Sequence, residues 1–246
     1  MGLLGGFRSV ASFLTILPVG FSTIEEMASY AFLFPFVGGL IGLACGLIGM
    51  VLFEFLPSDV AGWVLLAALA LITGLNHMDG LLDLGDALMV RGTREKKLEI
   101  LHDMHHGIGG FALIFFTLVI TQSLLVSLRS EIVFALVISE TLAKLSMVIM
   151  GAVGNPSEAG LGSTFIKSIG RRRRRTLTLS VAIAAVILAL ALPSAFAAIP
   201  LLLSIFFSLV MTRLLQRDFG CITGDMLGSL GELTRALSLL ALLFMV

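Results

Sequence analysis

Long runs of hydrophobic residues, separated by short turns and by three longer polar segments, dominate the chain. A run of about 17 to 25 apolar residues is long enough to cross the hydrocarbon core of a bilayer as an α-helix. A seventh such run, residues 233–246, is short. The pattern predicts an all-α, polytopic integral membrane helical bundle of six to seven transmembrane helices. The six clear runs are residues 29–53, 60–75, 110–127, 132–152, 178–192 and 195–212.

The amino-terminal stretch has one basic residue, Arg8, followed by the apolar residues 10–19. A secretory signal peptide has a similar order, but no small-residue cleavage site precedes Glu25 and Glu26. We therefore expect a retained interfacial or re-entrant segment that lies at, or dips into, the membrane surface.

The composition supports the membrane assignment. Hydrophobic residues make up 58% of the 246 positions and charged residues 13%, against about 25% charged residues in soluble domains. So little polar surface would not cover a globule in water. Basic and acidic residues balance at 16 each, which argues against a nucleic-acid-binding protein. Cys45 and Cys221 have no metal-binding spacing and are expected to be buried. We expect one integral membrane domain spanning residues 1–246.

Most of the basic residues lie on one side of the predicted spans. The polar segments 76–109, 153–175 and 213–235 contain 13 of the 16, and Arg8 is a fourteenth. The positive-inside rule assigns such segments to the cytoplasmic side. We expect a multi-pass protein of the cell membrane with its chemically active face toward the cytoplasm. The five arginines at 171–175 either fix this topology against anionic lipid headgroups or attract a phosphate-bearing substrate.

Three aspartates in the first polar segment have helical spacing. Asp79, Asp83 and Asp86 stand at i, i+4 and i+7, which places them on one face of a helix. Carboxylates on one face repel each other, and a divalent cation removes this repulsion. Apolar neighbours such as Leu81 and Leu84 argue against a merely solvated acidic face. We therefore expect these aspartates to bind Mg²⁺, with Mn²⁺ as an alternative.

All four histidines lie in the same segment. His77, two residues before Asp79, is a candidate for a phosphate contact or a proton relay. The carboxylate majority argues against zinc. For the other three we expect contacts with substrate or with the membrane interface in preference to metal ligation: His102, His105 and His106.

Two further acidic residues stand beside glycines. Asp103 precedes Gly107 and Gly110 at the start of a predicted helix, an arrangement that suits a phosphate contact. Asp225 follows Thr223, whose hydroxyl can donate to an oxygen. Both acids are expected on the same face as the aspartate stripe. Metal-binding carboxylates and basic residues at a membrane surface indicate transfer of a phosphate or diphosphate group.

These motifs resemble those of the cobalamin-5'-phosphate synthase family, also called adenosylcobinamide-GDP ribazoletransferase. The family's HxDGxxDxxD signature matches the stretch from His77 to Asp86, and its later DxxxGxxG motif matches Asp103 to Gly110. The remaining resemblances are residues 13–19, 34–38 and 160–165, together with Gly220, Thr223, Gly224, Asp225 and Gly228.

The chain departs from the family pattern at four positions. Ala87 stands where the family has glycine, and Met104 and His105 stand where it has serine and arginine. Lys144 is the only basic residue in the fourth predicted span, and it forms an i, i+4 pair with Glu140. We expect His105 and Lys144 to replace arginines in binding phosphate.

The resemblance implies that adenosylcobinamide-GDP is joined to alpha-ribazole or its 5'-phosphate, giving adenosylcobalamin or its phosphate and releasing GMP. It implies that Asp79, Asp83, Asp86 and Asp225 hold Mg²⁺. It assigns catalysis to His77, Asp86 and Asp103, with Asp103 as the base. It assigns phosphate binding to Gly107, Gly110, His105, Lys144, Thr223 and Gly224.

Two other classes fit parts of the sequence. A membrane prenyltransferase or a CDP-alcohol phosphotransferase also uses an acidic helix, but the second Asp-rich motif of the former and the DGxxAR pattern of the latter are absent. A transporter would place its acids near the midplane within an inverted repeat, and no such repeat is visible. The bilayer is the expected environment. Homo-oligomerisation, association with other cobalamin-assembly enzymes, the number of metal ions and the phosphorylation state of the acceptor stay open.

Overall fold

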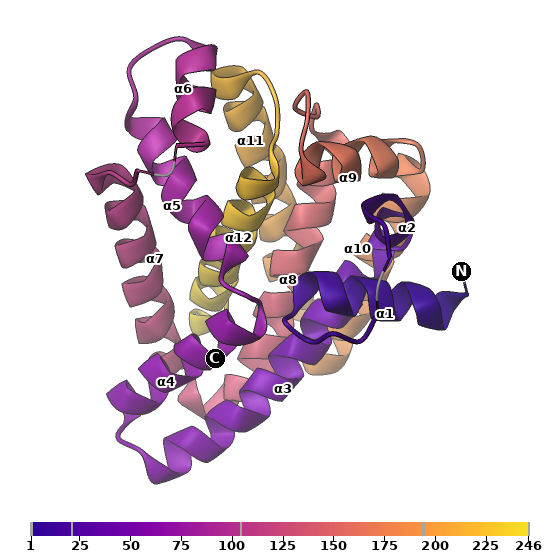
Figure 1. Cartoon of the computed structure of the whole chain (residues 1–246). Helices are drawn as coiled ribbons and strands as arrows, with labels where there is room; N and C mark the ends of the chain where they lie inside the picture. The colour runs from indigo at the N-terminus through magenta and orange to yellow at the C-terminus, as the bar shows by residue number, and fades with distance from the viewer. Residues whose placement is uncertain (1, 21, 104, 193–194, 246) are drawn as a thin grey trace.

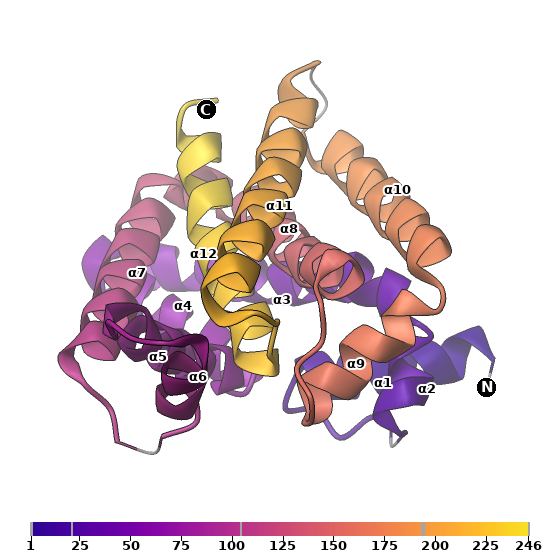
Figure 2. The ribbon, with the colours of Figure 1, turned by 90° about the horizontal axis from the view of Figure 1, so that it is seen from above.

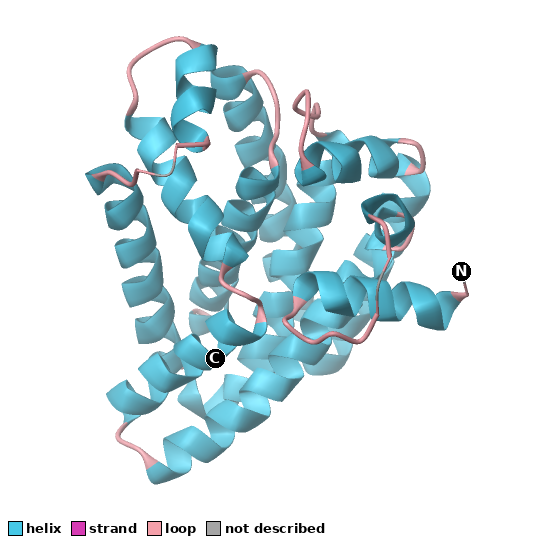
Figure 3. Cartoon of the chain, viewed as in Figure 1, coloured by secondary structure: helices cyan, strands magenta, loops and turns pink. Residues whose placement is uncertain are grey.

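The structure, a computed structural model, describes residues 2–20, 22–103, 105–192 and 195–245, nearly all of them helical (Figure 3). Met104, one of the departures from the family pattern, lies outside the described residues. The all-α prediction is confirmed. The α-helices are α1 (Leu3–Leu14), α2 (Ile24–Ala28), α3 (Phe34–Phe55), α4 (Ser58–Ile72), α5 (Asn76–Met89), α6 (Arg94–Leu101), α7 (Ile108–Ser127), α8 (Ile132–Val153), α9 (Leu161–Gly170), α10 (Arg173–Ala191), α11 (Ala198–Phe219) and α12 (Gly224–Leu243).

Six of these helices are long and apolar enough to cross a membrane: α3, α7, α8, α10, α11 and α12. Residues 60–75, which were expected to form a span on their own, are not among these six. They lie mainly in α4, and the pair α4 and α5 adds a seventh span if the two are taken together across a bend of 97°. The chain is therefore a multi-pass membrane protein, as the hydrophobic pattern predicted.

The last helix differs most from its prediction. It begins at Gly224, although the hydrophobic run starts only at residue 233. The earlier start adds Asp225 and Glu232 to the helix, and these two acids lowered the local hydrophobicity of the sequence before residue 233. Arg235 was expected on the cytoplasmic surface, but it is 1% exposed inside the bundle. Its charge is balanced there by acidic side chains, which is why the helix tolerates it.

Helix α8 lies at the centre of the bundle, between α3, α10, α11 and α12 (Figures 1 and 2). It packs most closely against α3, where Gly38, Gly42 and Gly46 recur every fourth residue. A Cβ atom at Gly42 would lie 2.2 Å from the carbonyl oxygen of Leu136 on α8. Small residues at this spacing let the backbones of membrane helices touch.

Helices α1 and α9 run across the direction of the long helices (Figure 1). Twelve residues of α1 extend about 18 Å, short of the roughly 30 Å of a hydrocarbon core. This length agrees with the predicted non-spanning amino-terminal segment. Phe13 stacks on Phe165 of α9, with ring centroids 6.1 Å apart, so two regions singled out in the sequence meet in space.

The bend between α4 and α5 orients the aspartate helix. Gly74 and Leu75 have φ values of +83° and +61°, in the left-handed region. The hydroxyl of Thr73 donates to the carbonyl oxygens of Leu69 and Ala70, which completes the end of α4. Because of this turn, α5 leaves the line of α4 and packs against α7 and α12 (Figure 1).

Candidate functional site

Residues from α5, the end of α6, the α6–α7 connection and α12 line one pocket of about 280 Å³. Helix α5 contributes two members of the aspartate stripe, and the first turn of α12 contributes a third carboxylate. The pocket thus joins motifs that are almost 150 residues apart in the sequence, as the prediction of a shared site required. Its lining residues are Asp79, Asp83, Leu101, His102, Asp103, His106 and Asp225.

Three side chains in this pocket converge in a way that suits a metal ion. One ligand atom each from Asp79, Asp83 and His106 lies within 4.8 Å of the other two. The Nδ1 atom of His106 is 3.7 Å from an Oδ1 oxygen of Asp83. Two carboxylates and one imidazole fit a divalent cation. The sequence interpretation favoured substrate or interface contacts for His106 over metal ligation, because a loop histidine has no helical spacing to link it to the stripe. The structure places its ring beside Asp83.

Asp225 is positioned by the start of α12. The hydroxyl of Thr223 accepts from the backbone N–H of Met226 at 3.4 Å and donates to Asp225 at 3.3 Å. Thr223 is thus the N-cap of this helix, and the helix dipole favours a carboxylate in its first turn. On the facing helix, a Cβ at Gly80 would lie 2.7 Å from the carbonyl oxygen of Asp225. Glycine at position 80 therefore lets α5 and α12 touch beside the pocket.

Asp103 lines the pocket, and its carboxylate is hydrogen-bonded to His105. Its Oδ1 oxygen accepts from the backbone N–H of His105 at 3.0 Å and lies 2.8 Å from the Nδ1 atom of the same residue. These hydrogen bonds, that of the imidazole first, lower the pKa of the Asp103 carboxyl. The His105 side chain is 94% exposed, so it points to solvent and not toward the pocket as its predicted phosphate contact would require.

Asp86 has a different environment from the other two members of the stripe. Its oxygens accept from the backbone N–H groups of Gly107 at 2.6 Å and Gly110 at 2.7 Å, at the start of α7. Asp86 lies outside the pocket lining and outside the converging metal group. The same bonds occupy the N–H groups of the two glycines that the sequence assigned to a phosphate. Asp86 therefore anchors α7 to α5.

We expect Asp86→Asn to lower the stability of the protein by about 1–3 kcal/mol, because an amide NH₂ would face a backbone N–H that now donates to a carboxylate oxygen. Thermal unfolding in detergent measures this change. We expect metal affinity to fall less in this variant than in Asp83→Asn. A larger fall in metal affinity for Asp86→Asn would show that Asp86 is a ligand.

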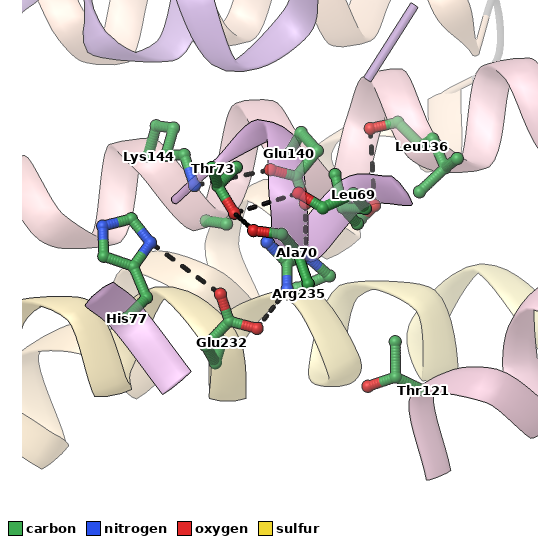
Figure 4. Close-up of polar contacts among 12 residues, drawn as sticks. Leu69, Ala70, Thr73, His77, Thr121, Leu136, Glu140, Lys144, Glu232 and Arg235 are labelled. Carbon is green, nitrogen blue, oxygen red and sulfur yellow. Dashed lines mark hydrogen bonds and ion pairs between the residues drawn. The ribbon is translucent and has the colours of Figure 1, made fainter. Parts of the chain in front are cut away.

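His77 and Lys144 lie away from the pocket lining, inside the bundle (Figure 4). The Nζ atom of Lys144 is 3.4 Å from a carboxylate oxygen of Glu140, and both side chains are completely buried. The Nδ1 atom of His77 lies 3.8 Å from Glu232. The structure thus pairs Lys144 with an internal acid, the alternative interpretation of its i, i+4 spacing, and does not bring it to the pocket where a phosphate would bind.

The family model and the curated relatives that match the chain belong to the same enzyme family. The family model of cobalamin-5-phosphate synthase matches residues 6–243. The chain is 31% identical to an adenosylcobinamide-GDP ribazoletransferase from Methanococcoides burtonii, over 98% of this chain and 92% of that protein. It is 35% identical to a protein of the same name from Pyrobaculum islandicum, over 94% and 92%. No solved structure matches the chain.

Proposed function

The chain belongs to the cobalamin-5-phosphate synthase family, and we propose that it acts as an adenosylcobinamide-GDP ribazoletransferase at the last assembly step of the cobalamin nucleotide loop. The observation that carries this assignment is the acidic pocket. Motifs spread along the chain supply Asp79, Asp83 and Asp225 to one cavity, on a match that covers almost the whole sequence.

The reaction exchanges one phosphorus–oxygen bond for another. A ribose hydroxyl of alpha-ribazole, or of its 5'-phosphate, attacks the phosphorus nearest the cobinamide. The bond from that phosphorus to the bridging oxygen breaks, GMP leaves with the oxygen, and the hydroxyl proton passes to a base. The products are adenosylcobalamin, or its 5'-phosphate, and GMP.

We assign the pocket carboxylates to the diphosphate end of this reaction. A divalent cation, Mg²⁺ or Mn²⁺, would neutralise charge on the diphosphate and on the leaving phosphate. Asp79 and Asp83, with His106 and Asp225 beside them, are the residues that would hold it. Asp103 is our candidate base. Its carboxylate lines the same pocket as Asp79 and Asp83, where it would accept the hydroxyl proton.

The start of α12 offers a place for a phosphate next to these acids. Gly224 is exposed there, and a Cβ at Gly162, on α9, would lie 2.3 Å from its backbone nitrogen. The amino-terminal ends of two helices therefore meet beside Asp225. Unpaired N–H groups and the helix dipole favour an anion at such an end. This arrangement supports the assignment of Gly224 to phosphate binding.

We also propose that this end of the bundle faces the cytoplasm. Helices α6 and α9 lie at the same end (Figure 1), and the five arginines that follow α9 are all exposed. Clustered basic residues beside a membrane span favour the cytoplasmic side. The large corrinoid substrate and the ribazole acceptor would then enter from the cytoplasm.

One assay tests the proposed activity. Purified protein in lipid nanodiscs is given adenosylcobinamide-GDP, alpha-ribazole 5'-phosphate and MgCl₂, and GMP is measured by chromatography. We expect GMP release that stops on addition of EDTA and resumes with excess MgCl₂ or MnCl₂. A parallel reaction with unphosphorylated alpha-ribazole identifies the preferred acceptor. Folded protein that releases no GMP with either acceptor would refute the assignment.

A further inference from the structure

Charged side chains inside the bundle form one connected group, which we call the buried charge network (Figure 4). Arg235 of α12 contacts both Glu140 of α8 and Glu232 of α12. Lys144 of α8 contacts Glu140 from the other side, at 3.4 Å. All four side chains are at most 5% exposed. None of the functions assigned above uses them.

The network is electrically neutral and alternates in sign, from Lys144 to Glu140 to Arg235 to Glu232. Buried charges are tolerated when they are paired and hydrogen-bonded. Sliding α12 along α8 would separate Arg235 from Glu140 and leave both charges without a partner. The network therefore fixes the relative position of these two central helices.

One member of the network also reaches the aspartate helix. Glu232 lies 3.8 Å from the Nδ1 atom of His77, in the first turn of α5, which is a close contact but longer than a hydrogen bond. Among the described residues, this Nδ1 atom is buried and has no hydrogen-bond partner. A Cβ at Gly228, one turn earlier on α12, would lie 3.0 Å from the Cα and Cδ2 atoms of His77. The backbone contact between Gly80 and Asp225 follows one turn further along. Helix α5 therefore packs against α12 in one register, and the contacts that define it run from His77 to the pocket.

We propose that Glu232 is a positioning residue, which holds His77 and with it α5 in register with α12, so that Asp79 and Asp225 face the same pocket. Glu232 acts through His77, two residues before Asp79, and touches neither metal nor substrate. In this arrangement His77 is a docking point on α12, a role other than the proton relay that its position in the sequence suggested. The inference rests on the proposed metal site.

The test measures Mn²⁺ binding by electron paramagnetic resonance on the full chain in nanodiscs. Glu232→Ala removes the contact with His77, whereas Glu232→Gln keeps an oxygen for Arg235 and an amide that can donate to Nδ1. Gly228→Ala pushes on His77 without changing any charge. Ser238→Ala is the matched control, because Ser238 is a buried polar residue of the same helix that contacts Ser204 of α11.

We expect Glu232→Ala and Gly228→Ala to weaken Mn²⁺ binding by about 10- to 100-fold, as loss of outer-sphere support for metal ligands does. We expect Glu232→Gln to bind close to wild type and Ser238→Ala to match it. Folded Glu232→Ala with wild-type affinity, or Glu232→Gln as weak as Glu232→Ala, would overturn the proposal. If Glu232→Ala does not fold, wild-type affinity in Gly228→Ala overturns it. If the wild-type protein itself binds no Mn²⁺, the metal site fails and not the positioning role.

Discussion

Asp83→Asn is expected to lower turnover by at least about 10²-fold, because charge stabilisation by a bound metal contributes several kcal/mol and each 1.4 kcal/mol changes the rate tenfold. Asp83 is one of the three converging residues and lies 3.7 Å from the Nδ1 atom of His106, so its loss removes a ligand from the group. The amide has the size of the carboxylate and relieves repulsion among the acids of the pocket, so we expect the fold to be retained. GMP release measures turnover, and size-exclusion chromatography in detergent measures folding.

The matched control is Asp218→Asn. Asp218 is another acid at this end of the bundle, and it pairs at 3.3 Å with Lys97 on the exposed surface, outside the pocket lining. We expect this variant to keep wild-type turnover. If Asp83→Asn also turns over at the wild-type rate, the metal-site assignment is wrong.

Arg235→Met is expected to destabilise the protein by about 3–5 kcal/mol, the usual cost of breaking a buried ion pair by removing one partner. The substitution leaves Glu140 and Glu232 with Lys144 as their only cation in the network. Thermal unfolding in detergent, or the yield of monodisperse protein, measures the effect. The comparison is Lys96→Gln, which breaks an exposed pair with Glu99 and is expected to change stability by at most about 1 kcal/mol.

A rescue variant distinguishes charge imbalance from poor packing. Removing all four charges together, as Arg235→Met, Lys144→Met, Glu140→Gln and Glu232→Gln, leaves no unpaired charge in the interior. Replacing a whole buried ion-pair group by neutral residues is often close to neutral for stability. We therefore expect the fourfold variant to be more stable than Arg235→Met alone. A fourfold variant that is less stable than the single one would show that the network contributes more than charge balance.

The sequence predicted the membrane helices because a long apolar run indicates a membrane-spanning helix by itself, without knowledge of distant residues. It did not predict where α12 begins, because Glu232 and Arg235 look like surface charges until Glu140, more than 90 residues away, is known to lie beside them. Mean hydropathy is calculated over consecutive residues, so it does not take account of a partner that is distant in the sequence. Lys144 is a different case, because its partner Glu140 is only four residues away and the i, i+4 spacing already indicated the pair.

At the site, the helical spacing of the aspartates predicted the correct face of α5 but not which residues of that face line the pocket. It placed Asp79 and Asp83 on one face and in one pocket. It also placed Asp86 there, but the start of α7 approaches that side of the helix and its N–H groups take up the carboxylate. His106 has no helical spacing with the aspartates, yet it lies beside Asp83, because the path of the α6–α7 connection brings it there. Helical spacing defines a face, and neighbouring elements decide which residues of that face remain available.

The neutrality of the buried charge network has an evolutionary consequence. A mutation that removes Arg235 is harmful unless one of the acids is lost as well. A mutation that removes Glu140 takes away an ion-pair partner from two cations at once. These positions are therefore expected to change together through compensating steps. Within this bundle, the four residues would be inherited as a unit, and a homologue that lacks the arginine should also lack one of its carboxylates.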